Sequence, residues 1–298
     1  MTLFGSAPQL WVSLPRNDAD LARAAAAAGA DGVKTHLNVA HRASGTGFGS
    51  VTTERAALSS VLEVGLPTGL VVGGEGAVTR AEIDTARSMG FAFFDVYLHH
   101  APAWYVDACA PVPAVAALGA DAPLDQARAM ATLGFAAVEA SFTPPEQYHT
   151  PLYADRVADY ARLAACTPLP VVIPSQHALT PDDVPALLAA GVSALLIGAV
   201  VTGTTPNQLR QVTAAFRAAI DTEAPRSKES KPCGEPNPFM RLPRCWRSAC
   251  FWLHVRQEAG PTKPPTPRRL TTVTTHLLTP TTLTVRTTGR PRTPQACG

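Results

Sequence analysis

Lysine is almost absent from the first 223 residues of this 298-residue chain, which carry eleven arginines but a single lysine, Lys34. A lysine amine can lose its proton when it is buried and then act as a base or a Schiff-base nucleophile, whereas a guanidinium stays charged. A composition that uses arginine nearly everywhere else therefore indicates a site at Lys34. The alternative is that codon bias removed the lysines and that this one survived by chance.

Cysteine is also scarce, and the spacing of the cysteines argues against a zinc site. The first 223 residues contain Cys109 and Cys166, which we expect to be ordinary buried thiols of a reducing compartment. Cys233, Cys245 and Cys250 lack the paired close spacing of a zinc site, and no histidine lies at finger spacing from them.

Long hydrophobic runs are missing as well, and we expect no leader in the first residues. Residues 1–15 contain no charged segment followed by an apolar core, and no apolar run approaches the length of a membrane span. We therefore expect a cytoplasmic protein that does not enter a membrane.

The chain changes character near residue 223. Up to that point 12 Lys and Arg stand against 20 Asp and Glu, whereas beyond it 13 stand against 3, and that segment holds 12 of the 28 prolines. So little apolar surface cannot offset the entropy of ordering. We expect residues 1–223 to form one domain and residues 224–298 to be a basic, disordered Pro/Thr/Arg-rich tail. The alternatives are an arm that docks on nucleic acid or an acidic membrane, and a stretch read out of frame; nucleic-acid binding is the less favoured.

Short apolar strands alternate with amphipathic helices through the first domain. We expect strands at residues 10–14, 32–38, 69–73, 92–98, 112–118, 136–141, 171–174 and 194–199. We expect helices at residues 18–28, 53–64, 80–89, 124–133, 153–165, 182–190 and 207–220. The connection after the fourth strand is too short and too rich in proline for a full helix. This count predicts an α/β fold, a (β/α)8 TIM barrel, with an open doubly wound sheet as the rival.

A glycine recurs where each helix gives way to the next strand, which supports the barrel. It stands at Gly29, Gly90, Gly134 and Gly191, where it would cap the C-terminus of the helix before the chain turns.

Strand alternation then assigns a direction to the polar residues. We expect these side chains to face the barrel axis: Lys34, His36, Asn38, Asp95, Tyr97, His99, Glu139 and Ser141. Barrel interiors are normally filled by Val, Ile and Leu, so inward charges are costly unless they are paired or used. Lys34 with Asp95 or Glu139 is therefore either a structural ion pair or a proton-transfer site.

The segment after the second strand, residues 39–50, is long, rich in glycine and carries His41, Arg42 and Ser44. This composition is typical of an anion-binding lid, with a merely flexible connection as the alternative.

Two further loops carry polar groups. His99 and His100 adjoin Trp104, and we expect a solvated pair rather than a metal site because no further ligand has a useful spacing. Residues 142–149 contain a Pro-Pro pair and are expected to form a second, stiff lid.

The segments 170–176 and 194–203 resemble the phosphate-binding TIM barrels. That group includes ribulose-phosphate epimerase, thiamine-phosphate synthase, indole-glycerol-phosphate synthase and N-acetylmannosamine-6-phosphate epimerase. The resemblance covers residues 8–221 in architecture and the seventh and eighth strands in motif. It implies a phosphate held by backbone N–H groups after these strands and by a helix N-terminus.

The match is good at Gly198 and Ala199, in the glycine-containing turn after the eighth strand. Ser175 and Gln176 stand where the group usually has a glycine pair, which implies that a hydroxyl and an amide replace backbone donors. The acetylmannosamine-phosphate epimerases pair a lysine with a carboxylate, and Lys34 with Glu139 is similar in kind.

These features lead to one main hypothesis, an isomerase, epimerase or lyase that acts on a small phosphorylated sugar-like metabolite by proton transfer beside a carbonyl. Lys34 would be the base or Schiff-base former, with Glu139 and Asp95 as acid/base partners. The remaining candidates are enolate-stabilising His36, Asn38 and His99, and the substrate- or phosphate-binding Asn38, His41, Arg42, Ser175, Gln176, Gly198 and Ala199.

No cofactor and no metal is expected under the main hypothesis. One alternative is an oxidoreductase that binds FMN on the same turn. Another is a non-catalytic barrel that binds a ligand or a partner protein through its basic tail. A homo-oligomer stays an open alternative.

Overall fold

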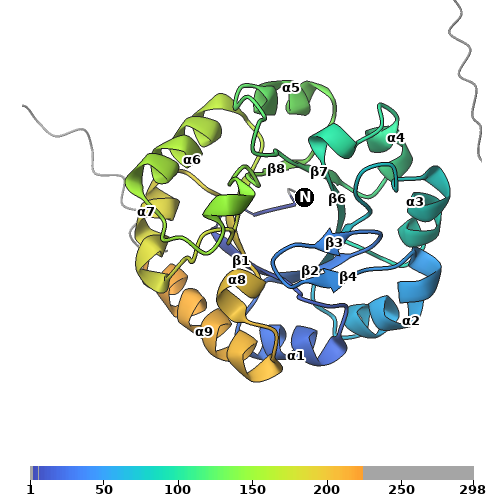
Figure 1. Ribbon diagram of the computed structural model, residues 1–298, viewed down its shortest axis with the longest axis horizontal. Helices are drawn as coiled ribbons and strands as arrows, with labels where there is room; N and C mark the ends of the chain where they lie inside the picture. Colours follow the sequence, from blue (N-terminus) through green and yellow to red (C-terminus); the bar gives the residue numbers. More distant parts are fainter. Residues whose placement is uncertain (1–2, 6, 224–298) are drawn as a thin grey trace, which may run out of the picture. The chain divides into compact units, whose positions relative to one another are not determined.

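The computed structural model describes residues 3–5 and 7–223, so the predicted tail at residues 224–298 lies outside the described residues. Eight parallel strands close into a barrel in the order β1, β10, β9, β8, β7, β6, β5 and β2 (Figure 1). The strands are β1 Gln9–Ser13, β2 Gly32–His36, β5 Thr68–Val71, β6 Phe93–Tyr97, β7 Ala114–Ala117, β8 Ala137–Glu139, β9 Val171–Pro174 and β10 Ala194–Ile197. The predicted TIM barrel is confirmed and the open sheet is wrong, because β1 pairs with both β10 and β2.

Helices surround the barrel and connect successive strands (Figure 1). They are α1 Ala19–Ala27, α2 Val51–Leu62, α3 Arg80–Arg87, α4 Tyr105–Cys109, α5 Gln126–Thr132, α6 Ala154–Cys166, α7 Val184–Ala189, α8 Ala199–Thr202 and α9 Pro206–Glu223. The short α4 stands where no full helix was predicted. The eighth strand was predicted too long, because β10 ends at Ile197 and Ala199 already begins α8.

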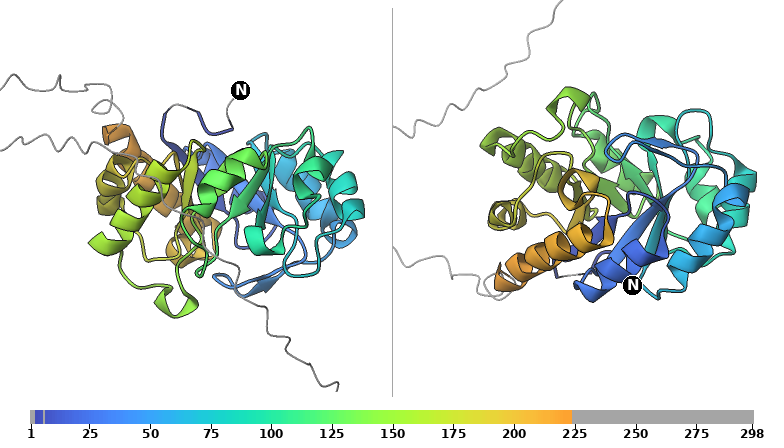
Figure 2. Two further views of the ribbon diagram at one scale, coloured as in Figure 1. Left: turned by 90° about the horizontal axis from the view of Figure 1, so that it is seen from above. Right: turned by 60° about the horizontal axis from the view of Figure 1, so that its bottom comes forward.

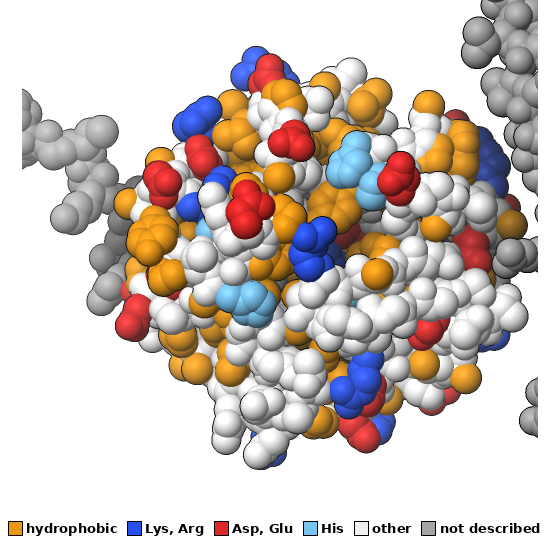
Figure 3. All heavy atoms as spheres, viewed as in Figure 1, with side chains coloured by type: hydrophobic (Ala, Val, Ile, Leu, Met, Phe, Trp, Pro, Cys, Tyr) orange, Lys and Arg blue, Asp and Glu red, His pale blue; other side chains and the backbone are white. Residues whose placement is uncertain are grey.

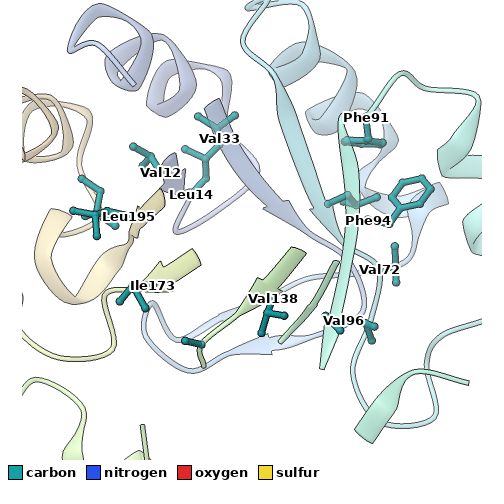
Figure 4. Packing of buried hydrophobic residues seen from close by; sticks show 14 of the residues in the cluster. Val12, Leu14, Val33, Val72, Phe91, Phe94, Val96, Val138, Ile173 and Leu195 are labelled. Carbon is teal, nitrogen blue, oxygen red and sulfur yellow. The ribbon is translucent and has the colours of Figure 1, made fainter. Parts of the chain in front are cut away.

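The outward residues of each strand pack under the helices. Val33, Phe94 and Val138 belong to this outer core, as the alternation predicts (Figure 4). Fully burying one such side chain contributes roughly 1.5–3 kcal/mol. This packing holds the strands in register and so determines which side chains point inward.

Three aromatic rings fill the N-terminal half of the barrel interior. Trp11 and Phe93 have ring centroids 5.3 Å apart, and Phe4, from the segment before β1, lies 5.6 Å from Trp11. Figure 2 shows this N-terminal segment at the end of the barrel opposite the short hairpin formed by β3 Ala40–His41 and β4 Thr46–Gly47. We call the three rings the aromatic plug; above it, the C-terminal half of the interior is left for polar side chains.

Glycine makes room for the aromatic plug on two neighbouring strands. A Cβ atom at Gly32 would overlap the Trp11 ring, and one at Gly69 would overlap the Phe93 ring. Large and small residues thus alternate around the barrel interior, as closure of a narrow barrel requires.

In the described part of the chain, no helix combines the length and apolar character needed to cross a membrane.

The two cysteines of the described residues differ in burial. Cys109 is buried as predicted, but Cys166 is only partly buried. The prediction was wrong for Cys166 because it ends α6, and a helix end has fewer neighbours than its middle.

Gly69→Ala should lower the free energy of unfolding by about 1–3 kcal/mol, because the new methyl group overpacks against Phe93. The Phe93 ring cannot easily move aside, since Trp11 and Phe4 pack against it. Urea unfolding of the full chain measures the effect. Gly47→Ala is the matched control, since a Cβ there meets nothing within 4 Å. Equal stability of the two variants, or no recovery when Phe93→Leu is added to Gly69→Ala, would contradict this account of the plug.

Candidate functional site

A cavity of about 690 Å³ lies at the C-terminal ends of the strands. Figure 3 looks onto this face and shows histidines and side chains of both charges around its hollow centre. The cavity is lined by every residue that the sequence proposed for the site: Lys34, Glu139, Asp95, His36, His99, Asn38, His41, Arg42, Ser175, Gln176, Gly198 and Ala199. The structure thus brings these residues together, while their roles stay predictions.

The deepest polar feature of the cavity is an ion-paired group of three residues. The Nζ atom of Lys34 donates to Oδ2 of Asp95 at 3.0 Å and also to Oε2 of Glu139. The three side chains come from β2, β6 and β8, which are alternate strands of the barrel and so contribute to one interior layer. All three are buried. We call this group the charged layer.

The two carboxylates of the charged layer differ in their further contacts. Oε1 of Glu139 accepts a hydrogen bond of 2.8 Å from the Ser141 hydroxyl. Oδ1 of Asp95 is buried without a hydrogen-bond partner among the described residues. A structural ion pair needs only one carboxylate, and a second buried carboxylate with an unpaired oxygen costs stability. Oδ1 of Asp95 is thus available to a ligand, and the structural ion pair stays the alternative.

The pKa shifts separate the roles of the three groups. Burial alone would lower the pKa of Lys34, but the charges of Glu139 and Asp95 outweigh it and raise that pKa above its usual 10.5. Burial raises the pKa of Asp95 to about 7, and the neighbouring charge of Glu139 adds to the rise, although Lys34 opposes it. Burial would raise the pKa of Glu139 too, but Lys34 and the hydrogen bonds lower it from 4.5.

Near neutral pH the charged layer therefore holds an ammonium at Lys34, a carboxylate at Glu139 and a carboxyl at Asp95 that can gain or lose its proton. This direction runs against Lys34 as the base or Schiff-base former, because the two carboxylates keep its amine protonated. Asp95 is the member of the charged layer whose pKa lies near neutral pH, and the catalytic roles of all three groups stay predictions.

The predicted anion-binding lid at residues 39–50 contains a short antiparallel hairpin. Its strands are β3 Ala40–His41 and β4 Thr46–Gly47, and we call residues 40–47 the hairpin lid. The imidazole of His41 lies 4.5 Å from that of His36, measured between ring centroids, and Nδ1 of His41 lies 2.8 Å from the Ser44 hydroxyl. The lid is thus held against the barrel rather than being a loose connection.

His36, under the hairpin lid, and His41, on the lid, are both neutral near pH 7. Burial, followed by the charges of His41 and Lys34, lowers the pKa of His36 well below 6.5. Burial and the charge of Lys34 lower the pKa of His41 to about 4. His36 lies within 3.4 Å of the Ser13 hydroxyl through Nε2, and it can stabilise an enolate oxygen only as a neutral N–H donor.

The turn after the eighth strand differs from a plain backbone cradle. The Gly198 N–H donates to the Ser175 hydroxyl oxygen at 2.8 Å, which leaves the Ser175 hydrogen for a ligand. The amide of Gln176 is engaged at both ends, accepting from the Thr143 N–H at 3.0 Å and donating to the Tyr148 hydroxyl at 2.8 Å. Gln176 therefore helps to hold the next loop in place. Its amide has a second hydrogen, so its predicted role at a phosphate stays a prediction.

That loop is the second predicted lid, residues 142–149. It contains a single turn of 3-10 helix, η2 Pro145–Gln147, and Tyr148 lines the cavity. The Pro-Pro pair and the hydrogen bonds of Gln176 together limit its movement.

Asn38 and the paired histidines are the least clearly functional of the predicted residues. Asn38 has a positive φ of 50° and donates its side-chain amide to Glu82 at 3.1 Å, which is a structural contact. His99 and His100 lie on η1 Leu98–His100 with ring centroids 4.1 Å apart. Within residues 3–5 and 7–223, no cluster of three or more His, Cys, Asp or Glu side chains is placed to hold a metal ion.

Sequence reasoning missed several residues that line the cavity. Ser13 was detectable, because it follows the inward Trp11 by two positions on β1. Tyr97 was expected to face inward but was not counted in the site; burial raises its pKa, so its hydroxyl stays protonated and can donate. Glu75 and Asp121 stand in loops after β5 and β7, and only the position of those loops at strand ends could have indicated them.

Asp95→Asn should become more stable relative to the unsubstituted protein as the pH rises from about 4 to about 7, and the gain should then level off. Between pH 3.8 and about pH 7 the unfolded chain has released the Asp95 proton while the folded chain retains it. The unsubstituted protein therefore loses stability as the pH rises through this window. The pKa of Glu139 is lowered from 4.5, so the contribution of Glu139 to the free energy of unfolding changes at a pH below this window.

Urea unfolding over this pH range measures the difference between the two proteins. Asp107→Asn, on the exposed surface of α4, controls for the loss of one carboxylate. A stability difference between Asp95→Asn and the unsubstituted protein that stays constant with pH would show that Asp95 is not perturbed as described.

No protein-family model and no curated protein sequence matches this chain. Its fold matches many solved structures. One is the phosphoribosyl anthranilate isomerase from Thermus thermophilus, at a TM-score of 0.54 and 14% identity over 72% of this chain and 98% of that chain. Another is a thiamine phosphate pyrophosphorylase from Pyrococcus furiosus, at a TM-score of 0.52 and 13% identity over 74% of this chain and 97% of that chain. A third is the N-acetylmannosamine-6-phosphate 2-epimerase from Clostridium perfringens, at a TM-score of 0.50 and 18% identity over 70% of this chain and 92% of that chain.

At these identities the likeness shows the fold alone. The resemblance to the phosphate-binding TIM barrels is confirmed at that level.

Proposed function

We propose that this chain is an enzyme that transfers a proton beside the carbonyl of a small phosphorylated sugar-like metabolite, as an isomerase, an epimerase or a lyase. The observation that carries the proposal is the charged layer, in which buried Lys34 contacts the buried carboxyl groups of Asp95 and Glu139 and burial raises the pKa of Asp95 to about 7. A general base or acid works best when its pKa lies near the operating pH.

In this scheme Asp95, as a carboxylate, removes the proton from the carbon next to the carbonyl. The ammonium of Lys34 has three hydrogens, of which two are engaged by Asp95 and Glu139, so the third can stabilise the oxygen that becomes negative. Glu139 keeps Lys34 charged through the reaction. The Asp95 carboxyl then returns the proton to the same carbon or to its neighbour.

Isomerisation is the reaction that needs the fewest groups. Asp95 and Glu139 lie in one layer of the barrel and therefore face the same side of a ligand above them. Returning the carbon-bound proton to the neighbouring carbon needs one acid/base group on one face, whereas direct epimerisation needs a second group on the opposite face. In the isomerisation, the Lys34 ammonium gives a proton to the former carbonyl oxygen and regains one from the neighbouring hydroxyl. The single titrating carboxyl supports a transfer between adjacent carbons.

Two features at the mouth of the cavity support a phosphorylated substrate. Arg42 on the hairpin lid lines the cavity and is exposed. The Ser175 hydroxyl and the start of α8 lie beyond the end of β10, at the same end of the barrel. Enzymes of this fold named for thiamine phosphate and for N-acetylmannosamine-6-phosphate are consistent with such a substrate.

The proposal predicts proton exchange between substrate and solvent. With a panel of aldose and ketose phosphates in deuterium oxide, the full chain should replace the hydrogen beside the carbonyl of at least one compound, as followed by proton NMR. Asp95→Asn and Lys34→Met should each slow this exchange by on the order of a hundredfold or more. Asp107→Asn, a matched change outside the cavity, should leave it unchanged. Exchange that survives in Asp95→Asn, or no exchange with any sugar phosphate, would refute the proposal.

The flavin enzyme and the non-catalytic binding barrel stay predictions. A yellow purified protein with flavin absorbance would support the first. Capture of a partner that is lost on deleting residues 224–298 would support the second.

A further inference from the structure

Cations are few among the charged side chains that line the cavity. Among the described residues that line it, only Lys34 and Arg42 carry positive charge, while Glu75, Asp95, Asp121 and Glu139 are acidic. Where each cation lies, and what already neutralises it, decides how many anionic groups a ligand can bring. This question rests on the proposed function, because it concerns the substrate of the same site.

Lys34 has one ammonium hydrogen left for the carbonyl oxygen of a ligand, but no free positive charge for a ligand carboxylate as well. Its ammonium is already paired with two carboxylates, and all three side chains are buried. A ligand carboxylate placed on the charged layer would lie beside Glu139 and the unpaired Oδ1 of Asp95, with no free cation. A buried and unpaired charge of this kind strongly opposes binding.

Arg42 offers the opposite environment. It lies on the hairpin lid between the last residue of β3 and the first of β4, its side chain is exposed, and no ion pair to it occurs within the described part of the chain. A guanidinium can bind a phosphate through two parallel hydrogen bonds. Its position at the mouth, above the charged layer, gives the site a charged outer end and an inner end without free positive charge.

We propose that the site accepts a ligand with one anionic group, held at the mouth by Arg42, and an uncharged hydroxyl-bearing carbonyl end on the charged layer. The substrate class is then the phosphates of neutral aldoses and ketoses. Phosphorylated sugar acids, which carry a carboxylate at the reacting end, are rejected.

Neutral hydroxyls suit the inner end for a chemical reason. Carboxylates accept hydrogen bonds and hydroxyls donate them, so Asp95 as a carboxylate, Ser13 and Ser141 can bind sugar hydroxyl groups without a net charge. The rim carboxylates of Glu75 and Asp121 can bind further hydroxyls and would repel a second anionic group.

Calorimetric titration of the full chain with matched ligand pairs tests the proposal. The pairs are ribose 5-phosphate with 5-phosphoribonate, and glucose 6-phosphate with 6-phosphogluconate, with inorganic phosphate as a further probe. In at least one pair the aldose phosphate should bind, and the acid should bind at least about a hundredfold more weakly. Glu139→Gln, which removes the buried negative charge, should narrow this difference.

Arg42→Gln should weaken binding of the aldose phosphate by roughly tenfold and leave the preference over the acid in place. The matched control is Arg55→Gln, an exposed arginine of α2 that does not line the cavity. Unfolding curves show whether each variant is folded, and Arg42 is exposed enough that its replacement should not disturb the barrel.

Equal binding of aldose and acid, or unchanged binding in Arg42→Gln, would overturn this inference. If deuterium exchange into an aldose phosphate still depended on Asp95, the proposed function would stand without it. Absence of both binding and exchange for every sugar phosphate would overturn the proposed function and this inference together.

Discussion

One ammonium held between two buried carboxylates is the interaction on which the rest of the site depends. Lys34, Asp95 and Glu139 occupy an interior layer that TIM barrels usually fill with apolar side chains. The aromatic plug of Phe4, Trp11 and Phe93 closes the barrel beneath this layer. The layer contains two carboxyl groups but only one ammonium. Because all three are buried, the second negative charge is unfavourable, and the pKa of one carboxyl group rises.

The pKa of Asp95 is raised and that of Glu139 is lowered because their surroundings differ. Glu139 accepts from both Lys34 and Ser141, whereas one oxygen of Asp95 has no partner among the described residues. Two carboxyl groups that contact the same lysine thus have pKa values shifted in opposite directions, upward for Asp95 and downward for Glu139. This separation allows one group to hold the lysine charge while the other exchanges a proton.

The mouth of the cavity departs from the simple backbone cradle that the resemblance implies. Ser175 binds the Gly198 N–H, and Gln176 ties down Thr143 and Tyr148, so these side chains mainly organise the turn and the neighbouring loop. The exposed cation at the mouth comes instead from Arg42 on the hairpin lid. A shared fold therefore positions the site without specifying which groups meet the ligand.

The sequence by itself determined the barrel and the inward direction of Lys34, Asp95 and Glu139. Both follow from local patterns, the alternation along each strand and the repeated strand and helix units. Only the tertiary structure decided that Lys34 contacts both carboxylates, that burial raises the pKa of Asp95, and that Gln176 hydrogen-bonds to a neighbouring loop. These outcomes depend on distances between strands far apart in the chain and on burial, and no local pattern encodes either. The same holds for Ser13 and Tyr148, which join the site because barrel closure and a folded loop bring them to it.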